Sequence, residues 1–428
     1  MNILCVNAAY APFVGGAEAY LRAMAERLAR DGHSLQVVTT DAAEVEAFWH
    51  PRKTRIAEPL AHIHGVDVRR VPLAYLPFAP LSFYLLRRVA TTIGRWPSSV
   101  RVLRPLAPLM PRVPRLARTL RALPQTFDFV HGVNIALEWP LIAAWRFARE
   151  RALPFIATPF VHVGESHSTA VLRNYTMPHQ LEPLRAADAV IAQTEIERQC
   201  LIEHGIRPER LYVHGMGVDL AEVQGGDGDA FRAARQIRGP IVLFLGVITK
   251  DKGSIHLLEA MRRLWSEEPL WAERATATLV LAGKPVIEFE TYWRTLPNDV
   301  TRRIIRTGIV AGAAKRDLLA AATVLVLPSR IDSFGAVYLE AWTNGVPVIG
   351  ARAGGVPAVI DDGQDGLLVR YGAVDELAAA IKRLLADDAY RRALGQAGQA
   401  KVRARYTWDM IYQQLQSLYT AVAATRDA

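Results

Sequence analysis

The sequence has little cysteine, no long apolar run and, over one stretch, no acidic residue. Its two cysteines, Cys5 and Cys200, are too few for a disulfide framework, which favours a reducing compartment. No uninterrupted apolar segment is long enough to span a bilayer, which excludes a protein inserted through helices. The first residues, MNILCVNAAYAP, carry no basic segment ahead of their apolar run, so we expect no signal peptide and a cytoplasmic location.

Acidic residues and lysine are both absent from residues 68–127. The same stretch holds more positive charge than the net charge of +9 that the whole chain carries. Its eleven arginines are Arg69, Arg70, Arg87, Arg88, Arg95, Arg101, Arg104, Arg112, Arg115, Arg118 and Arg121. Over the whole chain, 51% of the residues are hydrophobic, which excludes a disordered protein, and 428 residues suffice for two or three α/β domains.

This arginine-rich stretch combines apolar and basic segments. Residues 71–86 are apolar, aromatic and interrupted by prolines, and a helix is predicted within residues 100–123. Leu116, Leu120 and Leu123 fall on one side of that helix. Its broad basic face is formed by arginines at a three-residue step, namely Arg112, Arg115, Arg118 and Arg121. An apolar wedge beside a basic helix suits an anionic membrane surface, and the alternative is an insertion whose arginines are simply solvated.

The chemistry of the chain concentrates in residues 328–360. A short apolar strand at 323–327 precedes them, and Ser333 is expected to cap a helix from about Gly335 to Thr343. Asn344-Gly345 can end this helix in a left-handed turn before the next buried strand. Ligands of open α/β sheets bind at the carboxyl ends of the strands, so the loop before the helix is the candidate site.

The start of this helix suits a phosphate group. The backbone N–H groups of Gly335, Ala336 and Val337 lack helical partners, and Gly335 permits close approach. Asp332 precedes them and Glu340 follows, and helical spacing would separate these two acids by roughly 12 Å. Because a carboxylate can bind two adjacent hydroxyls, as in ribose recognition, this order of groups predicts a nucleotide-sugar site.

Two other strand–loop–helix units offer contacts to such a ligand. In one, the strand 241–245 leads through Lys250 and Lys252 into a helix, and lysines at this point can hold a diphosphate. In the N-terminal βαβ unit, Gly15 and Gly16 allow a ligand to approach the backbone, or they form only a packing turn. Their spacing is not the dinucleotide fingerprint, so no nicotinamide site is expected.

These stretches resemble the family-four retaining glycosyltransferases, a group 1 glycosyltransferase-like family. Its signature has a Glu, seven residues, a second Glu and then a Gly-Gly loop. In this chain Glu340 is the second acid, Gly354-Gly355 is the loop, and Asp332 stands at the first acidic position. Lys252-Gly253 matches the Lys-Gly of the family, whereas Val247 stands where the family usually has an arginine.

The resemblance implies an α/β protein of the GT-B fold, with two Rossmann-like doubly wound domains facing across a cleft. We expect residues 1–220 to form the acceptor-side domain, with the basic apolar insertion at about 68–127. Residues 221–239 are expected to be a linker, and 240–405 to form the nucleotide-sugar-binding domain. A last helix at 406–428 is expected to cross back to the first domain.

The resemblance also implies roles for individual residues. Lys252 and the helix N–H groups would stabilise the leaving diphosphate, Glu340 would hold the ribose, and Asp332 would hold sugar hydroxyls near the reacting carbon. His162 matches a histidine that lies near donor and acceptor in the family, so the predicted catalytic residues are Asp332, His162 and Lys252. Lys250 is a hypothetical replacement for the arginine missing at Val247. The predicted donor-binding residues are Gly15, Gly16, Lys250, Lys252, Ile309, Val310, Asp332, Ser333, Phe334, Gly335, Ala336, Val337 and Glu340.

The predicted reaction moves a hexose from a nucleotide-sugar, with a UDP-sugar favoured and a GDP-sugar possible, to a hydroxyl of a lipid-linked or polysaccharide acceptor. The anomeric configuration is retained and the leaving phosphate acts as base, without the two-carboxylate mechanism of retaining hydrolases. The enzyme is expected to be peripheral on the inner face of a bacterial plasma membrane. No nucleic-acid partner is expected, because the arginine-rich stretch lacks lysine and any recognisable binding motif.

No cofactor and no metal are expected. His62-x-His64 could bind a metal but lacks a supporting acid or cysteine, and Asp227-x-Asp229 lies in a glycine-rich tract that favours a flexible turn. Three alternative functions remain open. They are transfer to a soluble small acceptor, a membrane-associated nucleotide-sugar-binding protein that has lost catalysis, and a sugar-nucleotide epimerase, against which the two acids argue.

Overall fold

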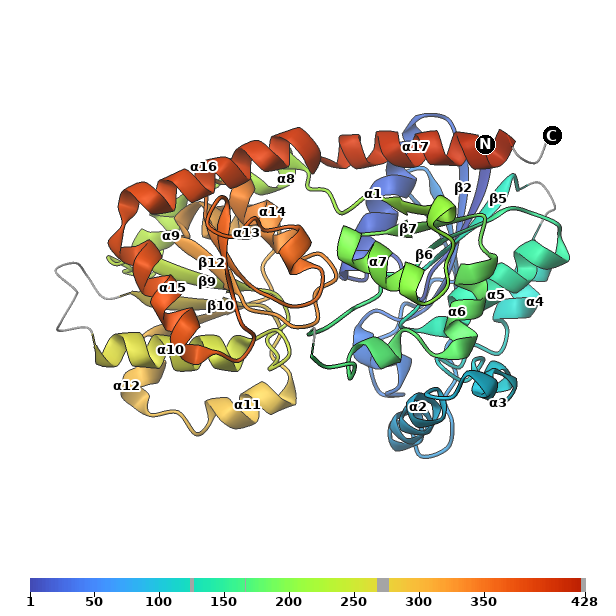
Figure 1. Cartoon of the computed structure of the whole chain (residues 1–428), viewed down its shortest axis with the longest axis horizontal. Helices are drawn as coiled ribbons and strands as arrows, with labels where there is room; N and C mark the ends of the chain where they lie inside the picture. Colours follow the sequence, from blue (N-terminus) through green and yellow to red (C-terminus); the bar gives the residue numbers. More distant parts are fainter. Residues whose placement is uncertain (124–126, 166, 268–276, 425–428) are drawn as a thin grey trace. The chain divides into compact units, whose positions relative to one another are not determined.

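The computed structural model describes residues 1–123, 127–165, 167–267 and 277–424 (Figure 1). It divides into two units. Unit 1 comprises Met1–His162, Thr169–Gly215 and Ile411–Ala428, and unit 2 comprises Val163–Ser168 and Met216–Met410. Residues 221–239, expected to be a linker, therefore belong to unit 2, where they form the short helices α8 (Leu220–Val223) and α9 (Gly228–Ala234).

Unit 2 is built on a six-stranded parallel sheet with the strand order β11-β10-β9-β12-β13-β14. Its strands are β9 (Ile241–Leu245), β10 (Thr278–Ala282), β11 (Ile304–Gly308), β12 (Val324–Leu327), β13 (Val348–Ala351) and β14 (Gly366–Val369). The central strands β9 and β12 are buried on both faces, as their continuous apolar sequences require. The order reverses between β9 and β12, and in such sheets the crevice beyond the carboxyl ends at this reversal binds ligands.

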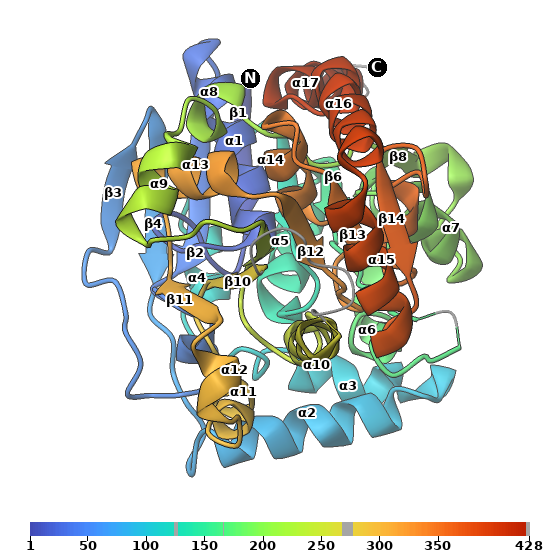
Figure 2. The same cartoon turned by 90° about the vertical axis from the view of Figure 1, so that its left-hand side faces the viewer.

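Helices flank this sheet (Figure 2). Besides α8 and α9 they are α10 (Ser254–Ser266), α11 (Ile287–Trp293), α12 (Asn298–Thr301), α13 (Gly312–Ala321), α14 (Ala336–Thr343), α15 (Val374–Ala386) and α16 (Asp388–Arg405). The predicted strand at 323–327 and helix at 335–343 agree with β12 and α14 to within a residue, and Gly345 is left-handed after α14 as predicted (φ 69°).

Unit 1 contains an eight-stranded sheet with the order β3-β4-β2-β1-β5-β6-β7-β8, parallel except where β3 pairs with β4. Its strands are β1 (Asn2–Val6), β2 (Ser34–Thr40), β3 (Leu60–Ile63), β4 (Val66–Val71), β5 (Phe129–Val133), β6 (Phe155–Thr158), β7 (Ala189–Ala192) and β8 (Leu211–Val213). Its helices are α1 (Gly16–Arg30), α2 (Leu81–Ile93), α3 (Val100–Leu106), α4 (Leu116–Arg121), α5 (Glu138–Glu150), α6 (Pro178–Ala186) and α7 (Glu195–Glu203).

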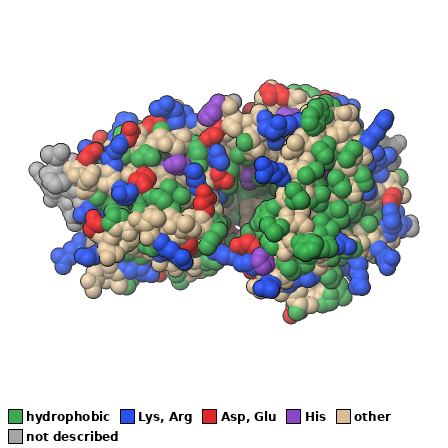
Figure 3. All heavy atoms as spheres, turned by 90° about the horizontal axis from the view of Figure 1, so that it is seen from below, with side chains coloured by type: hydrophobic (Ala, Val, Ile, Leu, Met, Phe, Trp, Pro, Cys, Tyr) green, Lys and Arg blue, Asp and Glu red, His purple; other side chains and the backbone are tan. Residues whose placement is uncertain are grey.

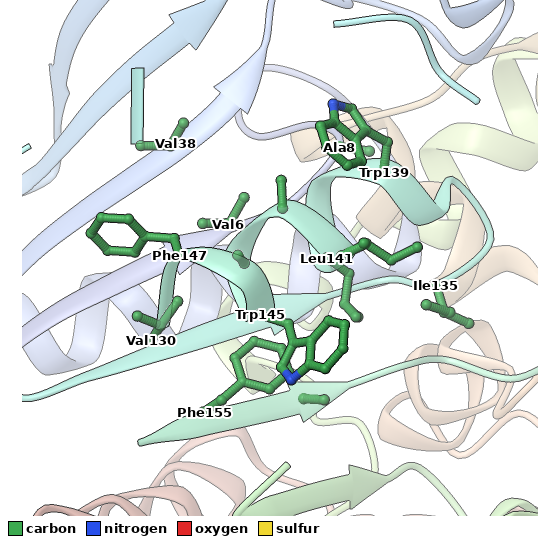
Figure 4. Close-up of a cluster of buried hydrophobic side chains, with 14 of the residues drawn as sticks. Val6, Ala8, Val38, Val130, Ile135, Trp139, Leu141, Trp145, Phe147 and Phe155 are labelled. Atoms are coloured by element: carbon green, nitrogen blue, oxygen red, sulfur yellow. The ribbon is translucent and has the colours of Figure 1, made fainter. Parts of the chain in front are cut away.

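One hydrophobic cluster of unit 1 packs α5 against the sheet, and buried side chains of α1 and of the last helix, α17 (Trp408–Ala424), add to the core outside this cluster. The cluster drawn in Figure 4 joins Leu141, Trp145 and Phe147 of α5 to Val130 and Phe155 of the sheet. Helix α17 adds to this unit from Ile411 onward. Its Tyr419 hydroxyl lies 2.5 Å from Nδ1 of the buried His131, and the Tyr419 ring packs edge-on against Phe129.

The helix predicted within residues 100–123 is wrong in its extent. The structure has two helices, α3 and α4, and the prolines at 108, 111 and 114 fall between them because they cannot continue the first helix. Arg112 consequently lies outside α4 and donates to the Tyr75 carbonyl at 2.9 Å, and Arg121 forms a two-bond ion pair with Glu150. The four arginines at the three-residue step do not form one helical face. The leucines Leu116, Leu120 and Leu123 are buried, as predicted.

Side chains of the two sequence patterns considered for metal binding form hydrogen bonds in the structure. Nδ1 of His62 lies 2.9 Å from Asp67, and Nδ1 of His64 lies 2.8 Å from Glu26. The Asp227 side chain accepts from the Ala230 N–H and caps α9. Among the described residues, no group of three metal-binding side chains gathers at one point, and no helix is long and apolar enough to cross a membrane.

Candidate active site

Two loops bring opposite charges together where the strand order of unit 2 reverses. Lys252 lies in the loop between β9 and α10, and Asp332 lies in the loop between β12 and α14. The Lys252 Nζ is 2.5 Å from the Asp332 Oδ1, and both side chains are partly buried. The structure thus joins two of the three predicted catalytic residues directly, although 80 positions separate them in the sequence.

Glycines fix the backbone of these loops. Gly253 is left-handed (φ 78°), and a Cβ on it would lie 2.4 Å from the Pro328 carbonyl oxygen. Gly354 is also left-handed (φ 60°), and a Cβ there would lie 2.2 Å from the Asp332 carbonyl oxygen. Gly355 N–H donates to that same carbonyl at 2.9 Å. The Gly-Gly loop therefore supports the backbone of Asp332 at a distance that no side chain would permit.

Replacing Gly354 with alanine should destabilise unit 2 and displace Asp332. Gly345→Ala is the matched control, because Gly345 is equally left-handed but has no atom within 4 Å of the place that a Cβ would take. In urea unfolding followed by tryptophan fluorescence, the free energy of unfolding of the control should fall by only about 1–2 kcal/mol, which is the cost of a left-handed alanine. We expect Gly354→Ala to lose more stability than Gly345→Ala, and to weaken nucleotide binding, which the control should keep. Equal losses in both variants would show that Gly354 does not hold Asp332.

Helix α14 begins after Gly335, where the sequence predicts a phosphate site. Gly335 is its N-cap, left-handed (φ 88°) and without a side-chain cap, so the predicted capping by Ser333 is wrong. The physical reason is local packing. The Tyr338 ring occupies the space that a Cβ on Gly335 would take. The Tyr338 hydroxyl holds the ring there by donating to the Leu327 carbonyl at 2.6 Å. The N–H groups of Ala336 and Val337 belong to the first turn, whose donors have no partners within the helix.

Glu340 lies on α14, one turn beyond this helix start. Its Oε1 accepts from the Lys315 ammonium at 2.6 Å. Its Oε2 is buried and has no hydrogen-bond partner in the part of the chain that the structure describes. A buried carboxylate oxygen without a donor is costly, and a ligand hydroxyl would satisfy it.

A second ion pair beside the first was missed in the sequence. Arg330 donates to Asp251 through Nε and Nη2 at 3.0 and 2.7 Å, and its Nη1 lies 3.9 Å from Glu165. Its guanidinium also covers the Tyr371 ring at 5.2 Å. The sequence shows an arginine two residues before Asp332. Its partners Asp251 and Glu165 lie in other loops, so these ion pairs could not be predicted from the sequence.

The other predicted donor-binding residues of unit 2 lie in the loops that follow β9, β11 and β12. Lys250 is exposed, and its carbonyl accepts from the Tyr371 hydroxyl at 2.9 Å. Val247, at the position where an arginine was expected, is 48% exposed. Ile309 and Val310 follow β11, the edge strand, and Phe334 is buried. Burial lowers the pKa of His256, and the nearby charges of Lys250 and Arg330 lower it further.

The predicted residues of unit 1 lie at the carboxyl edge of its own sheet. Gly15 caps α1, and Glu18 folds back over it, because a Cβ on Gly15 would lie 2.2 Å from the Glu18 Oε2. Burial raises the pKa of Glu18 to about 7, although its own backbone N–H and Asn7 hydrogen-bond to it. The His162 ring stacks on Tyr175 with centroids 4.7 Å apart. Gly15 and Gly16 stay predicted donor contacts, and His162 stays a predicted catalytic residue.

Solved structures with the same fold were found by comparison. HepE of Anabaena, solved with UDP and glucose, superimposes with a TM-score of 0.71 over 98% of this chain and all of that chain, at 20% identity. Sucrose-phosphate synthase of Thermosynechococcus elongatus gives a TM-score of 0.70 over 99% of this chain and all of that chain, also at 20% identity. With its two parallel-sheet α/β units, the protein has the GT-B fold.

Family models and relatives then define the family. Residues 15–217 match the model described as glycosyl transferase 4-like domain, and residues 239–387 match that of glycosyl transferases group 1. The chain belongs to the group 1 glycosyltransferase family. It is 31% identical to a D-inositol 3-phosphate glycosyltransferase of Streptomyces bingchenggensis, over 67% of this chain and 65% of the relative. It is 30% identical to an alpha-maltose-1-phosphate synthase of Mycolicibacterium smegmatis, over 61% of this chain and 73% of the relative.

Proposed function

We propose that this glycosyltransferase moves a hexose from a nucleoside diphosphate sugar to a hydroxyl acceptor with retention of the anomeric configuration. The observation that carries the proposal is the Lys252–Asp332 pair at the sheet reversal, beside the start of α14. A diphosphate placed there would lie on a helix N-terminus and beside a lysine, and both stabilise negative charge. Without a donor, Asp332 neutralises Lys252, so the donor would exchange this partner for its phosphate.

In this proposal each acid binds one part of the donor. Lys252 and the N–H groups of Ala336 and Val337 stabilise the phosphate oxygen that leaves as the sugar C1–O bond breaks. Asp332, released from Lys252, accepts from sugar hydroxyls, and the Oε2 of Glu340 accepts from the ribose. The leaving phosphate takes the proton of the acceptor hydroxyl, so the protein needs no separate base. Lys252 and the N-terminus of α14 offset part of the negative charge on the phosphates, and we propose that no metal is required.

The donor is proposed to be a UDP-sugar, with a GDP-sugar as the second choice. HepE, which shares the fold, was solved with UDP and with UDP-glucose. The acceptor is proposed to be a lipid-linked or polysaccharide hydroxyl at a cytoplasmic membrane surface. A soluble phosphorylated acceptor is the second candidate, because one relative is named for inositol 3-phosphate and another for a phosphorylated sugar product, maltose 1-phosphate.

Turnover of UDP- and GDP-hexoses in the presence of EDTA tests the proposed reaction. One of the α-linked donors should release its nucleoside diphosphate, slowly with water and faster with an acceptor. The sugar first formed should be the α anomer, as followed by proton NMR before it mutarotates. A β anomer would contradict retention. Tight nucleotide binding without any turnover would favour the alternative of a binding protein that has lost catalysis.

A further inference from the structure

Helix α2 of unit 1 exposes an apolar stripe that no described residue covers. Its inner side packs into a small core of Ala90, Leu103, Met110 and Met177. Its outer side carries Leu81, Leu85 and Val89, spaced by four residues, and the first two are 73% and 66% exposed. Phe78, just before the helix, is 88% exposed. Residues four apart lie on one face of a helix, so these side chains form one continuous surface.

We call the apolar stripe and its extension the α2–α3 surface, and define it by its exposed hydrophobic side chains. They are Phe78, Leu81, Tyr84, Leu85, Val89, Trp96 and Val102. Figure 3 shows hydrophobic side chains gathered over the right-hand part of the molecule, where α2 and α3 lie. Large contiguous apolar patches on a soluble protein mark interaction sites.

The charge within the segment that carries this surface is entirely positive, and Glu46 of another segment lies near Tyr84. Arg88, Arg95 and Arg101 are exposed among its apolar residues, and no carboxylate pairs with them in the described ranges. The whole segment 68–127 contains no acid to offset them. Such a combination of exposed leucine, aromatic and arginine side chains on one helix is typical of proteins that lie in the interface of an anionic bilayer.

An arginine-lined groove adjoins the surface through α3. It encloses about 540 Å³ and is lined by Arg104, Trp145, Arg146, Arg149, Glu182, Arg185 and Ala186. Arg104 belongs to α3 and pairs with Glu182, the only acid of the lining. Arg185 donates to the His204 carbonyl, and Arg149 covers the Trp145 ring at 5.2 Å. Burial and the nearby Arg104 charge lower the pKa of Arg146, so an anion in the groove would be stabilised.

We propose that unit 1 docks on an anionic membrane through this face. The α2–α3 surface enters the boundary between headgroups and acyl chains, while the arginine-lined groove binds the phosphate of a lipid headgroup. The inference rests on the acceptor proposed above, because a lipid-linked acceptor must be reached at such a surface. It places the docking residues at α2, α3 and the groove, instead of at Arg112, Arg115, Arg118 and Arg121.

Vesicle co-sedimentation of the full chain tests the proposal. Wild type should bind vesicles of phosphatidylcholine with about 30% phosphatidylglycerol, and binding should fall steeply in roughly 0.5 M NaCl or on pure phosphatidylcholine. Leu81→Gln with Leu85→Gln should abolish most of the binding. Arg146→Gln with Arg149→Gln should weaken binding about fivefold for each charge removed. The control Arg403→Gln with Arg405→Gln removes the same charge from exposed positions of α16 and should bind as wild type does.

The outcomes separate docking from catalysis. The docking proposal would be overturned if wild type bound both vesicle types equally or bound neither. It would also be overturned if the α16 control lost as much vesicle binding as the variant with Arg146→Gln and Arg149→Gln. So would a wild type that is dimeric in solution and becomes monomeric with the Leu81 and Leu85 changes, since a second copy would then cover the surface. Inorganic phosphate at millimolar concentration should not displace the protein from vesicles. Because the docking variants lie in unit 1 and the nucleotide site lies in unit 2, circular dichroism and the melting temperature report the folding of all variants. Donor turnover without vesicle binding would leave the proposed function standing.

Discussion

Replacing Lys252 with alanine should lower kcat for hexosyl transfer about 100- to 1,000-fold, the effect of removing one preorganised donor from a developing anion. The Lys252 ammonium lies 2.5 Å from Asp332 at the strand reversal, where the departing diphosphate is proposed to lie. The loss should fall mainly on kcat, because the charge on the bridging oxygen grows as the bond to the sugar breaks.

Two lysine variants sharpen this experiment. Lys382→Ala, which removes a surface ion pair between α15 and Glu267, is the control and should leave kcat within about twofold of wild type. Lys250→Ala tests whether Lys250 supplies the contact that Val247 lacks, and it should then weaken donor binding. An unchanged kcat in Lys252→Ala would remove Lys252 from the mechanism, whatever Lys250 does.

Replacing Glu340 with alanine should weaken binding of the nucleoside diphosphate by about 1–3 kcal/mol, the loss of hydrogen bonds to a charged group. The Oε1 of Glu340 is held by Lys315, while the buried Oε2 has no partner among the described residues and would accept from a ribose hydroxyl. Titration calorimetry measures the loss directly. Glu376→Ala, which removes a surface carboxylate paired with Arg352 and Arg370, is the matched control and should bind as wild type does.

A double-mutant cycle with 2′-deoxy-UDP assigns the contact. Wild type should prefer UDP over 2′-deoxy-UDP, and Glu340→Ala should lose most of that preference, because the ribose hydroxyl no longer has its acceptor. A preference that is as large in the variant as in the wild type would place the ribose elsewhere in the site.

Much of unit 2 could be predicted from its sequence because its signals are local. Continuous apolar strands such as β9, the left-handed Gly345 after α14 and the Lys252-Gly253 turn each depend on residues within a few positions. The direct pairing of Lys252 with Asp332 was not predicted, because their approach depends on the strand order, and the family resemblance placed each residue only against the donor.

The failures have long-range or steric causes. Ser333 does not cap α14, because the Tyr338 ring crowds the helix start and only a glycine fits there. The arginines at a three-residue step looked like one helical face, but the prolines among them divide the segment into α3 and α4. Arg330 joins Asp251, 79 positions away, and Glu165 of the segment 163–168, contacts that no local pattern encodes.

Calorimetric titration of the wild type with UDP, GDP, ADP and dTDP in EDTA tests the central claim most directly. The account predicts that one of the four binds clearly without a divalent cation, because Lys252 and the start of α14 stabilise the negative charge of the diphosphate. Binding of none, or binding only after a divalent cation is added, would contradict the assignment of this site to a nucleotide-sugar held by protein groups alone.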